Sequence, residues 1–177
     1  MLNRGLKFLD SNDELPVFGI EFPGQTLNPA DPPSIELHLW NNKDASIEKT
    51  ASGIEIKVLN YLKTTTGEDN YGGQEVIDDD LIEAKSDGIV GSGIVDDAQA
   101  SYTPIGAATS LSVGDIPINC ARKIFFKLQS QVGTTTEEAI FFIQVSYKYN
   151  RVQTFTITVS VNEHRFFGNY FFGGVLF

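Results

Sequence analysis

Hydrophobic and polar residues alternate one by one along several segments of the chain, and this two-residue period predicts β-strands. In "VFGIEF" (residues 17–22) the alternation puts Phe18, Ile20 and Phe22 on one face. The segments "SIELHLW" (34–40) and "GIEIKV" (53–58) repeat it with Ile35, Leu37 and Leu39, and with Ile54, Ile56 and Val58. Each segment is expected to be a strand with one buried face.

The second half of the chain shows the same period more strongly. The apolar positions of "KIFFKL", "AIFFIQVSYKY" and "RVQTFTITVSV" are Ile124, Phe126, Leu128; Ala139, Phe141, Ile143, Val145, Tyr147, Tyr149; and Phe155, Ile157, Val159, Val161. Thr154, Thr156 and Thr158 alternate with the last set, as on a solvated sheet surface. The short connection "KYNR" predicts a hairpin around Asn150.

Between these strands lie segments rich in proline and glycine, at residues 22–34, 64–75 and 86–99, which predict turns. Many short strands and no helical period predict an all-β fold, an antiparallel β-sandwich, with a small barrel as the alternative. We divide the chain into an extended N-terminal arm with the first strand and a Pro-rich connector (1–33), a sandwich body (34–162) and a C-terminal aromatic segment (163–177).

Composition fits one globular domain and narrows the class of partner. The chain has 177 residues, of which 41% are hydrophobic and 20% charged. Its formal net charge is −10 without a basic cluster, so nucleic acid is not an expected partner. The start lacks the apolar core of a signal peptide, and no segment is as long and apolar as a membrane helix. We expect neither Sec export nor a membrane partner.

Residues that could carry chemistry are few and scattered. His38 is expected on the outer face of its strand as a surface histidine, and neither it nor His164 has companions at a metal-ligand spacing. Cys120 is the single cysteine and is expected to be a buried thiol. Asp78–Asp80, with Asp96 and Asp97, lack the order of a calcium loop and predict a solvated acidic loop.

The glycines of "GIVGSG" (88–93) lack the order of a phosphate-binding loop and predict a flexible loop. We therefore expect no enzyme, with no catalytic, cofactor or metal site. A hydrolase that uses Cys120 or the acidic loops is the weakest alternative. A glycan-binding module is a stronger one, since Trp40 could stack on a sugar that Asn41 and Asn42 hydrogen-bond; alternatively, Trp40 packs beneath a loop.

The segment "HRFFGNYFFGGVLF" (164–177) holds five of the thirteen phenylalanines. Gly168 and Asn169 separate two aromatic pairs and could form a hairpin turn, which predicts a small aromatic ribbon. Its two apolar faces would be buried between subunits, in the chain's own core, or against a lipid or apolar ligand. We expect a protein interface made by Phe166, Phe167, Tyr170, Phe171, Phe172 and Phe177.

The run "IELHLWNNKDASIEKTASGIEIKVL" resembles the opening hairpin of bacterial immunoglobulin-like sandwiches, and "LSVGDIPINCARKIFFKLQ…EEAIFFIQVSYKY" continues the likeness. The segments "LHLWNNK", "GDIP…CAR" and "DDAQ" are similar to parts of structural proteins of tailed bacteriophages. The resemblance covers residues 34–149 and transfers no site residue. It implies a virion component, of the tail, baseplate, neck or capsid surface, that is assembled in the host cytoplasm. The implied partners are other copies of the chain and neighbouring virion proteins, with a host glycan under the alternative reading.

Overall fold

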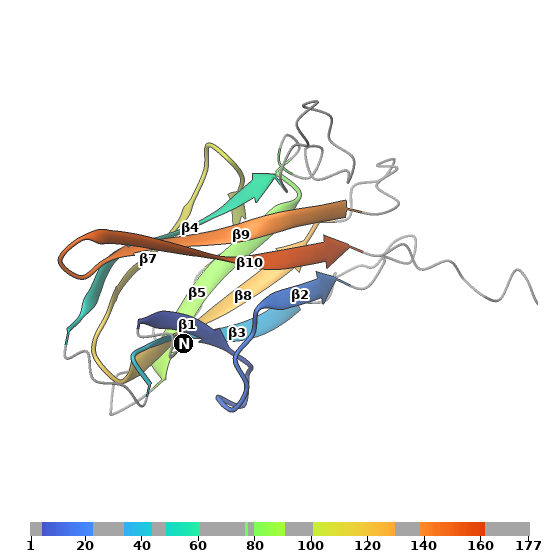
Figure 1. The fold of residues 1–177 in the computed structure, drawn as a ribbon. Coiled ribbons are helices and arrows are strands. Elements are labelled where there is room, and N and C mark those ends of the chain that lie inside the picture. The colour runs from blue at the N-terminus through green and yellow to red at the C-terminus, as the bar shows by residue number, and fades with distance from the viewer. Residues whose placement is uncertain are drawn as a thin grey trace, which may run out of the picture.

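A computed structural model describes residues 5–22, 34–43, 49–60, 77, 80–90, 101–129 and 139–161. Within these residues ten strands form two five-stranded sheets that pack face to face (Figure 1). The Pro-rich connector and the aromatic segment at 163–177 lie outside the described residues. So do Asp78, Asp79, Asp96 and Asp97.

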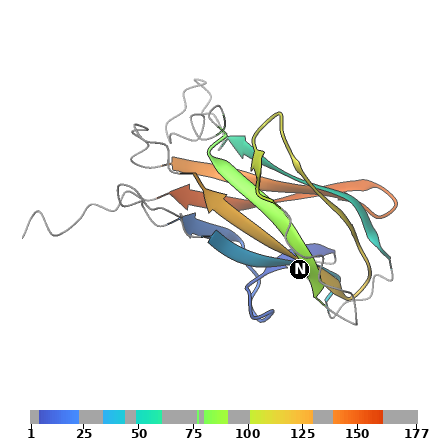
Figure 2. The same cartoon turned by 180° about the vertical axis from the view of Figure 1, so that it is seen from behind.

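The first sheet has the strand order β1-β3-β8-β5-β6, and all its pairs are antiparallel. Figure 2 views the molecule from behind, where β5 (green), β8 (orange) and β3 (blue) of this sheet lie toward the viewer. The bounds are β1 Leu6–Leu9, β3 Ser34–Asn41, β8 Cys120–Leu128, β5 Ile82–Val90 and β6 Thr103–Ile105.

The second sheet has the order β2-β10-β9-β4-β7. Its pairs are antiparallel except that β2 runs parallel to β10. The bounds are β2 Gly19–Phe22, β10 Val152–Val161, β9 Ala139–Lys148, β4 Ala51–Asn60 and β7 Leu111–Ile116. The predicted hairpin around Asn150 is confirmed, because β9 and β10 pair from Lys148 and Val152 onward.

Strands from both halves of the chain are interleaved in each sheet, which gives a sandwich of immunoglobulin-like topology. The two sheets are separate, so the fold is the predicted sandwich and not the alternative barrel. The long predicted strands are all present, and their apolar faces meet in one core. Its largest fully buried side chains include Phe22, Phe126, Phe141, Ile54, Ile56 and Ile143.

The described N-terminal residues, 5–22, belong to the sandwich and do not form a separate arm. The backbone N–H of Val17 bonds to the carbonyl of Phe8 in β1, whereas the carbonyl of Phe18 accepts from Thr158 in β10. The chain therefore crosses from the first sheet to the second at Val17 and Phe18. Phe8 and Phe22 are both buried in the core, so the boundary drawn at residue 34 does not separate two structural units.

The turn predicted from residue 86 onward does not begin there, because residues 86–90 belong to strand β5. Strand β5 continues through Gly88 to Val90, and its register with β8 shifts between Asp87 and Ile89. A glycine at such an irregularity lets a strand bend without ending it. The sequence rule that glycine ends a strand was therefore wrong here.

Candidate protein-interaction site at the β1–β2 loop

The loop between β1 and β2, residues 10–18, crosses from one sheet to the other and exposes two large apolar side chains. Leu15 is 65% exposed and Phe18 is 70% exposed. Phe18 was predicted to share a buried face with Ile20 and Phe22, but it precedes the first residue of β2. Its side chain therefore does not follow the alternation of the strand.

Asp10 closes this loop on itself. Its carboxylate accepts hydrogen bonds from the backbone N–H groups of Glu14, at 2.8 Å, and Leu15, at 3.2 Å. The backbone of Asp10 also donates to the carbonyl of Leu15 at 3.0 Å and accepts from Asp13 at 3.0 Å. The bond from Glu14 is the main cause that lowers the pKa of the Asp10 carboxyl below its ordinary value.

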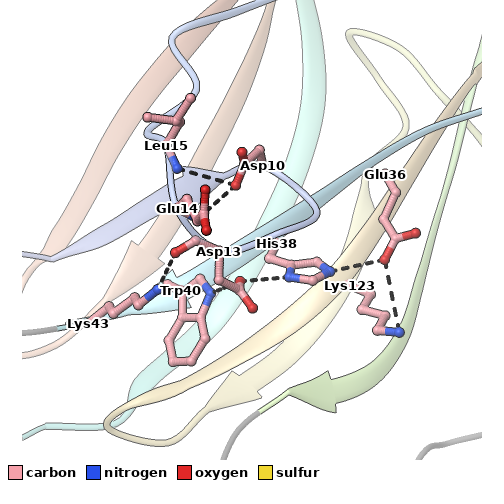
Figure 3. Close-up of polar contacts among 9 residues, drawn as sticks. All are labelled: Asp10, Asp13, Glu14, Leu15, Glu36, His38, Trp40, Lys43 and Lys123. Atoms are coloured by element: carbon pink, nitrogen blue, oxygen red, sulfur yellow. Dashed lines mark hydrogen bonds and ion pairs between the residues drawn. The ribbon is translucent and has the colours of Figure 1, made fainter.

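Asp13 fastens the closed loop to the outer face of the first sheet (Figure 3). Its carboxylate lies 2.7 Å from Nδ1 of His38 and accepts a hydrogen bond from Nε1 of Trp40. Its backbone carbonyl accepts from Nζ of Lys43. Asp13 has φ 63°, a left-handed conformation that aspartate tolerates better than most residues.

His38 continues this set of contacts across the sheet. Its Nε2 lies 3.0 Å from Oε1 of Glu36, and the same oxygen lies 3.9 Å from Nζ of Lys123 on β8 (Figure 3). His38 lies on the predicted outer face, but it is only 4% exposed because the β1–β2 loop covers it. The prediction of a surface histidine was wrong, and the ring is a buried bridge between two carboxylates.

Trp40 packs beneath the same loop. This is the second of the two alternatives that the sequence allowed, the first being that Trp40 stacks on a sugar. Its side chain forms a small buried cluster with Leu9 and Ala121, and Nζ of Lys43 lies 5.1 Å from the ring centroid. Trp40 is 9% exposed and its N–H is bound by Asp13. A sugar needs an open ring face, and Trp40 does not present one.

The two asparagines that follow Trp40 are also turned inward. Nδ2 of Asn41 donates to the carbonyls of Lys49 and Ile116, both at 2.8 Å, and its Oδ1 accepts from the hydroxyl of Tyr149. Asn42 is buried with φ 59°, and its N–H donates to Gly5 at 3.3 Å. The polar groups of Trp40, Asn41 and Asn42 bind other parts of the same chain, and their geometry gives no support to a glycan contact there.

The other residues considered for chemistry lie apart. Cys120 is 3% exposed at the start of β8, which confirms the buried thiol. Asp80 comes just before the first residues of β5, whereas Cys120 lies beside the last residues of β5, and the Asp80 carboxylate lies 3.5 Å from the hydroxyl of Thr109. In the ranges that the structure describes, no three His, Cys, Asp or Glu side chains are grouped to hold a metal ion, and no helix is long and apolar enough to span a membrane.

Sequence reasoning missed Asp10, Asp13 and Leu15. The signal was present in "DSNDELP", because an aspartate followed by small polar residues is typical of turns in which the carboxylate binds backbone N–H groups. What the pattern could not show is the sheet to which that turn attaches. The result is a loop, fixed by exposed and partly buried polar contacts, that holds Leu15 and Phe18 at the surface.

Comparison with solved structures finds chains that are similar to this one in part. One solved structure is the ASH/PapD-like domain 7 of human CEP192, at 11% identity and TM-score 0.43, covering 90% of this chain and 85% of that one. The periplasmic chaperone SfaE matches at 15% sequence identity with a TM-score of 0.36. CfaE, the adhesive subunit of the CFA/I fimbria of enterotoxigenic Escherichia coli, matches at 9% identity with a TM-score of 0.41. Both matches cover 90% of this chain, which spans 58% of SfaE and 49% of CfaE.

No family model and no curated protein sequence matches the chain. At these identities and TM-scores, likeness to the solved structures carries no information about activity or partners.

Proposed function

We propose that this protein is a non-enzymatic structural component of a tailed-phage virion and acts by protein–protein assembly. The observation that carries the proposal is the β1–β2 loop, which keeps Leu15 and Phe18 exposed while Asp10 and Asp13 hold the backbone in place. A loop that is already ordered loses little conformational entropy on binding, so more of the interaction energy remains as affinity.

The size of the expected contribution is sufficient for a specific contact. Burying one large apolar side chain contributes about 1.5–3 kcal/mol, so Leu15 and Phe18 together would contribute about 3–6 kcal/mol before the costs of association. The aromatic segment at residues 163–177 would add further apolar surface to the same assembly. The net charge of −10 would keep the remaining surface soluble.

The phage setting is supported by the likeness of "LHLWNNK", "GDIP…CAR" and "DDAQ" to segments of phage structural proteins. In such a particle the chain would be present in many copies beside neighbouring virion proteins. We place it in the tail, baseplate, neck or capsid surface.

The test is to look for the protein in purified phage particles and to measure what removes it. Mass spectrometry of particles should find the wild-type chain in stoichiometric amounts. The double variant Leu15→Ser/Phe18→Ser and a chain lacking residues 168–177 should fold, with unchanged far-UV circular dichroism, but be incorporated at reduced levels. Glu14→Ser changes a neighbouring exposed side chain of the loop and is the control. Absence of the wild-type chain from particles would overturn the proposal.

A further inference from the structure

Strand β10 has an open edge along its first half. It has 10 residues and pairs with β9 along its whole length, but on the other side only its last four residues, from Thr158 to Val161, pair with β2. Figure 1 shows β2 beside the end of β10 while the β9–β10 hairpin projects beyond it. Within the described ranges, no strand pairs with residues 152–157 on this side.

The backbone groups along this open edge point outward. The N–H of Thr158 points away from β9, because it donates to the carbonyl of Phe18 at 3.1 Å. Backbone groups of alternate residues in a strand point to the same side, so those of Thr156, Thr154 and Val152 point to the same edge as Thr158. They form a row of donors and acceptors that suits another strand.

Every other outer strand of the two sheets carries a feature that discourages pairing with a further strand. Such features are charged residues, proline and irregular register. The edge strands carry Lys7 in β1, Glu21 in β2, Pro104 in the three-residue β6, and Gly114 and Asp115 in β7, whose register with β4 is shifted. The half of β3 that β1 leaves uncovered carries Glu36.

Residues 152–157 of β10 have none of these features. Their sequence is "VQTFTI", with no charge and no proline, and their register with β9 is regular. Two copies of a chain with net charge −10 repel each other, so they can approach most easily where the surface is uncharged. This edge is therefore suited to a second copy of the same chain.

We infer that two copies associate by antiparallel pairing of these half-edges around a two-fold axis. Because Val152, Thr154 and Thr156 carry the outward backbone groups, the axis lies at Thr154. Thr154 faces Thr154 of the second copy, and Val152 faces Thr156. The second sheet of each copy has five strands, and the two sheets then form one continuous ten-stranded sheet across the dimer.

The exposed apolar side chains agree with this arrangement. Val152 is 72% exposed at one end of the half-edge, and Phe18 is 70% exposed beside Thr158 at the other end. Antiparallel pairing brings Val152 of each copy toward the end at which Phe18 of the other copy lies. Two separate patches of exposed apolar surface are then covered by the same association.

This dimer deepens the proposed function and rests on it, since it names one contact through which an assembly component would join copies of itself. It is centred on residues 152–157 of β10, whereas incorporation into particles is proposed for the β1–β2 loop and residues 163–177. Phe18 lies at both contacts, so the dimer is tested at Thr154, which belongs to β10 alone. The two can be tested separately.

Thr154→Lys and Thr158→Lys form a matched pair. Both residues are exposed on the same strand and the same face, but Thr158 has β2 beside it and Thr154 has the open edge. Thr154→Lys places two like charges opposite each other at the axis, and we expect the dimer dissociation constant to rise about tenfold or more. Thr158→Lys, which lies beside β2 and has no strand of the second copy opposite it, should raise it far less. Light scattering of the full-length protein over a concentration series measures both, with far-UV circular dichroism to verify folding.

A cross-link tests the register directly. Residues opposite each other in a hydrogen-bonded antiparallel pair have Cα atoms about 5.5 Å apart, within the span of a disulfide. Thr154→Cys should give a covalent dimer on mild oxidation, and Thr158→Cys should not. Denaturing electrophoresis without a reducing agent distinguishes the two results. The natural Cys120 is buried and should not interfere.

A dimer that is weakened far more by Thr154→Lys than by Thr158→Lys, and linked by Thr154→Cys alone, supports the inference. A wild-type monomer at every concentration, or equal behaviour of the two members of either pair, overturns it. Neither result touches the incorporation of the chain into particles, so failure of the dimer and failure of the proposed function are distinguishable.

Discussion

Asn41 joins four parts of the sandwich through one buried amide. It ends β3, donates to the carbonyl of Lys49 just before β4 and of Ile116 at the end of β7, and accepts from Tyr149 in the β9–β10 turn. A buried amide with all these partners satisfied fixes the relative position of the segments that it binds. From sequence, Asn41 was a candidate for hydrogen bonding to a glycan beside Trp40.

Asn41→Leu should lower the free energy of unfolding by about 3 kcal/mol, because two carbonyls and one hydroxyl lose a buried partner. Chemical denaturation measures this change. Asn150→Ala is the control, since Asn150 is exposed in the hairpin turn and its loss should cost less than about 0.5 kcal/mol. Similar losses for the two variants would contradict the role assigned to Asn41.

Asp13 can be tested with the only tryptophan of the chain as reporter. Asp13→Ala removes the acceptor for the buried donors of His38 and Trp40, and we expect a stability loss of about 1–3 kcal/mol. The loop should also open over the indole, which would shift the fluorescence of Trp40 to longer wavelength. Glu14→Ala is the matched control in the same loop. An unshifted spectrum for Asp13→Ala would show that Asp13 does not hold the loop down.

At the scale of elements, β2 depends on the close approach of Gly19 to β10. A Cβ atom at Gly19 would lie 3.3 Å from the carbonyl oxygen of Thr158, which leaves little room for a side chain. A β2 of only four residues has few contacts with which to offset such a displacement. The small residue at this position is a requirement of strand pairing.

Gly19→Val should weaken the pairing of β2 with β10. The amide of Thr158, which donates to Phe18, should exchange its hydrogen about tenfold faster, since overpacking costs of order 1 kcal/mol or more. The amide of Ile157 points toward β9 and is the internal control. Acceleration at both amides would mean that the variant loosens the whole hairpin and not β2 alone.

The strands predicted from sequence are those in which alternation runs over six residues or more. The faces of β4, β8, β9 and β10 were predicted residue by residue, because one buried face imposes a two-residue period on the sequence. Strand β1, with four residues, and β6, with three, are too short to show a period. Strands β5 and β7 contain glycine, which hid them among turns.

At the scale of the whole molecule, the stability of the sandwich should fall at high pH because of two tyrosines at the β9–β10 hairpin. Burial raises the pKa of Tyr149 to about 12, with a further contribution from Tyr147, and burial also raises the pKa of Tyr147. Their rings contact edge to face, with centroids 5.3 Å apart. The folded state therefore favours the neutral phenols.

This arrangement predicts a loss of stability in alkaline solution. In the unfolded chain both tyrosines ionise near pH 10, whereas in the folded chain Tyr149 stays protonated up to about pH 12. Their contribution is thus fully present below pH 10 and is lost as the pH rises from there through about 12. Melting temperatures across this range measure the effect, and Tyr149→Phe should show a shallower decline. A decline of equal slope in both proteins would contradict it.

The sequence alone determined the all-β class, the two-sheet sandwich and the inward residues of its long strands, because burial of one face is encoded locally by alternation. It also located Cys120 in the interior. Tertiary structure decided what covers an outward face. His38 was predicted at the surface and is buried, and of the two alternatives for Trp40 the packed one holds, because a loop that is distant from both residues in the chain folds over that face.

The same holds for the edges of the sheets. Which strand lies at an edge, and over what length a neighbour covers it, follows from pairings such as that of β2 with the last four residues of β10. No period of the segment "VQTFTI" records that one side of its backbone is open. Local sequence sets which face of a strand is buried, and only the long-range order of strands sets which backbone groups are left for a partner.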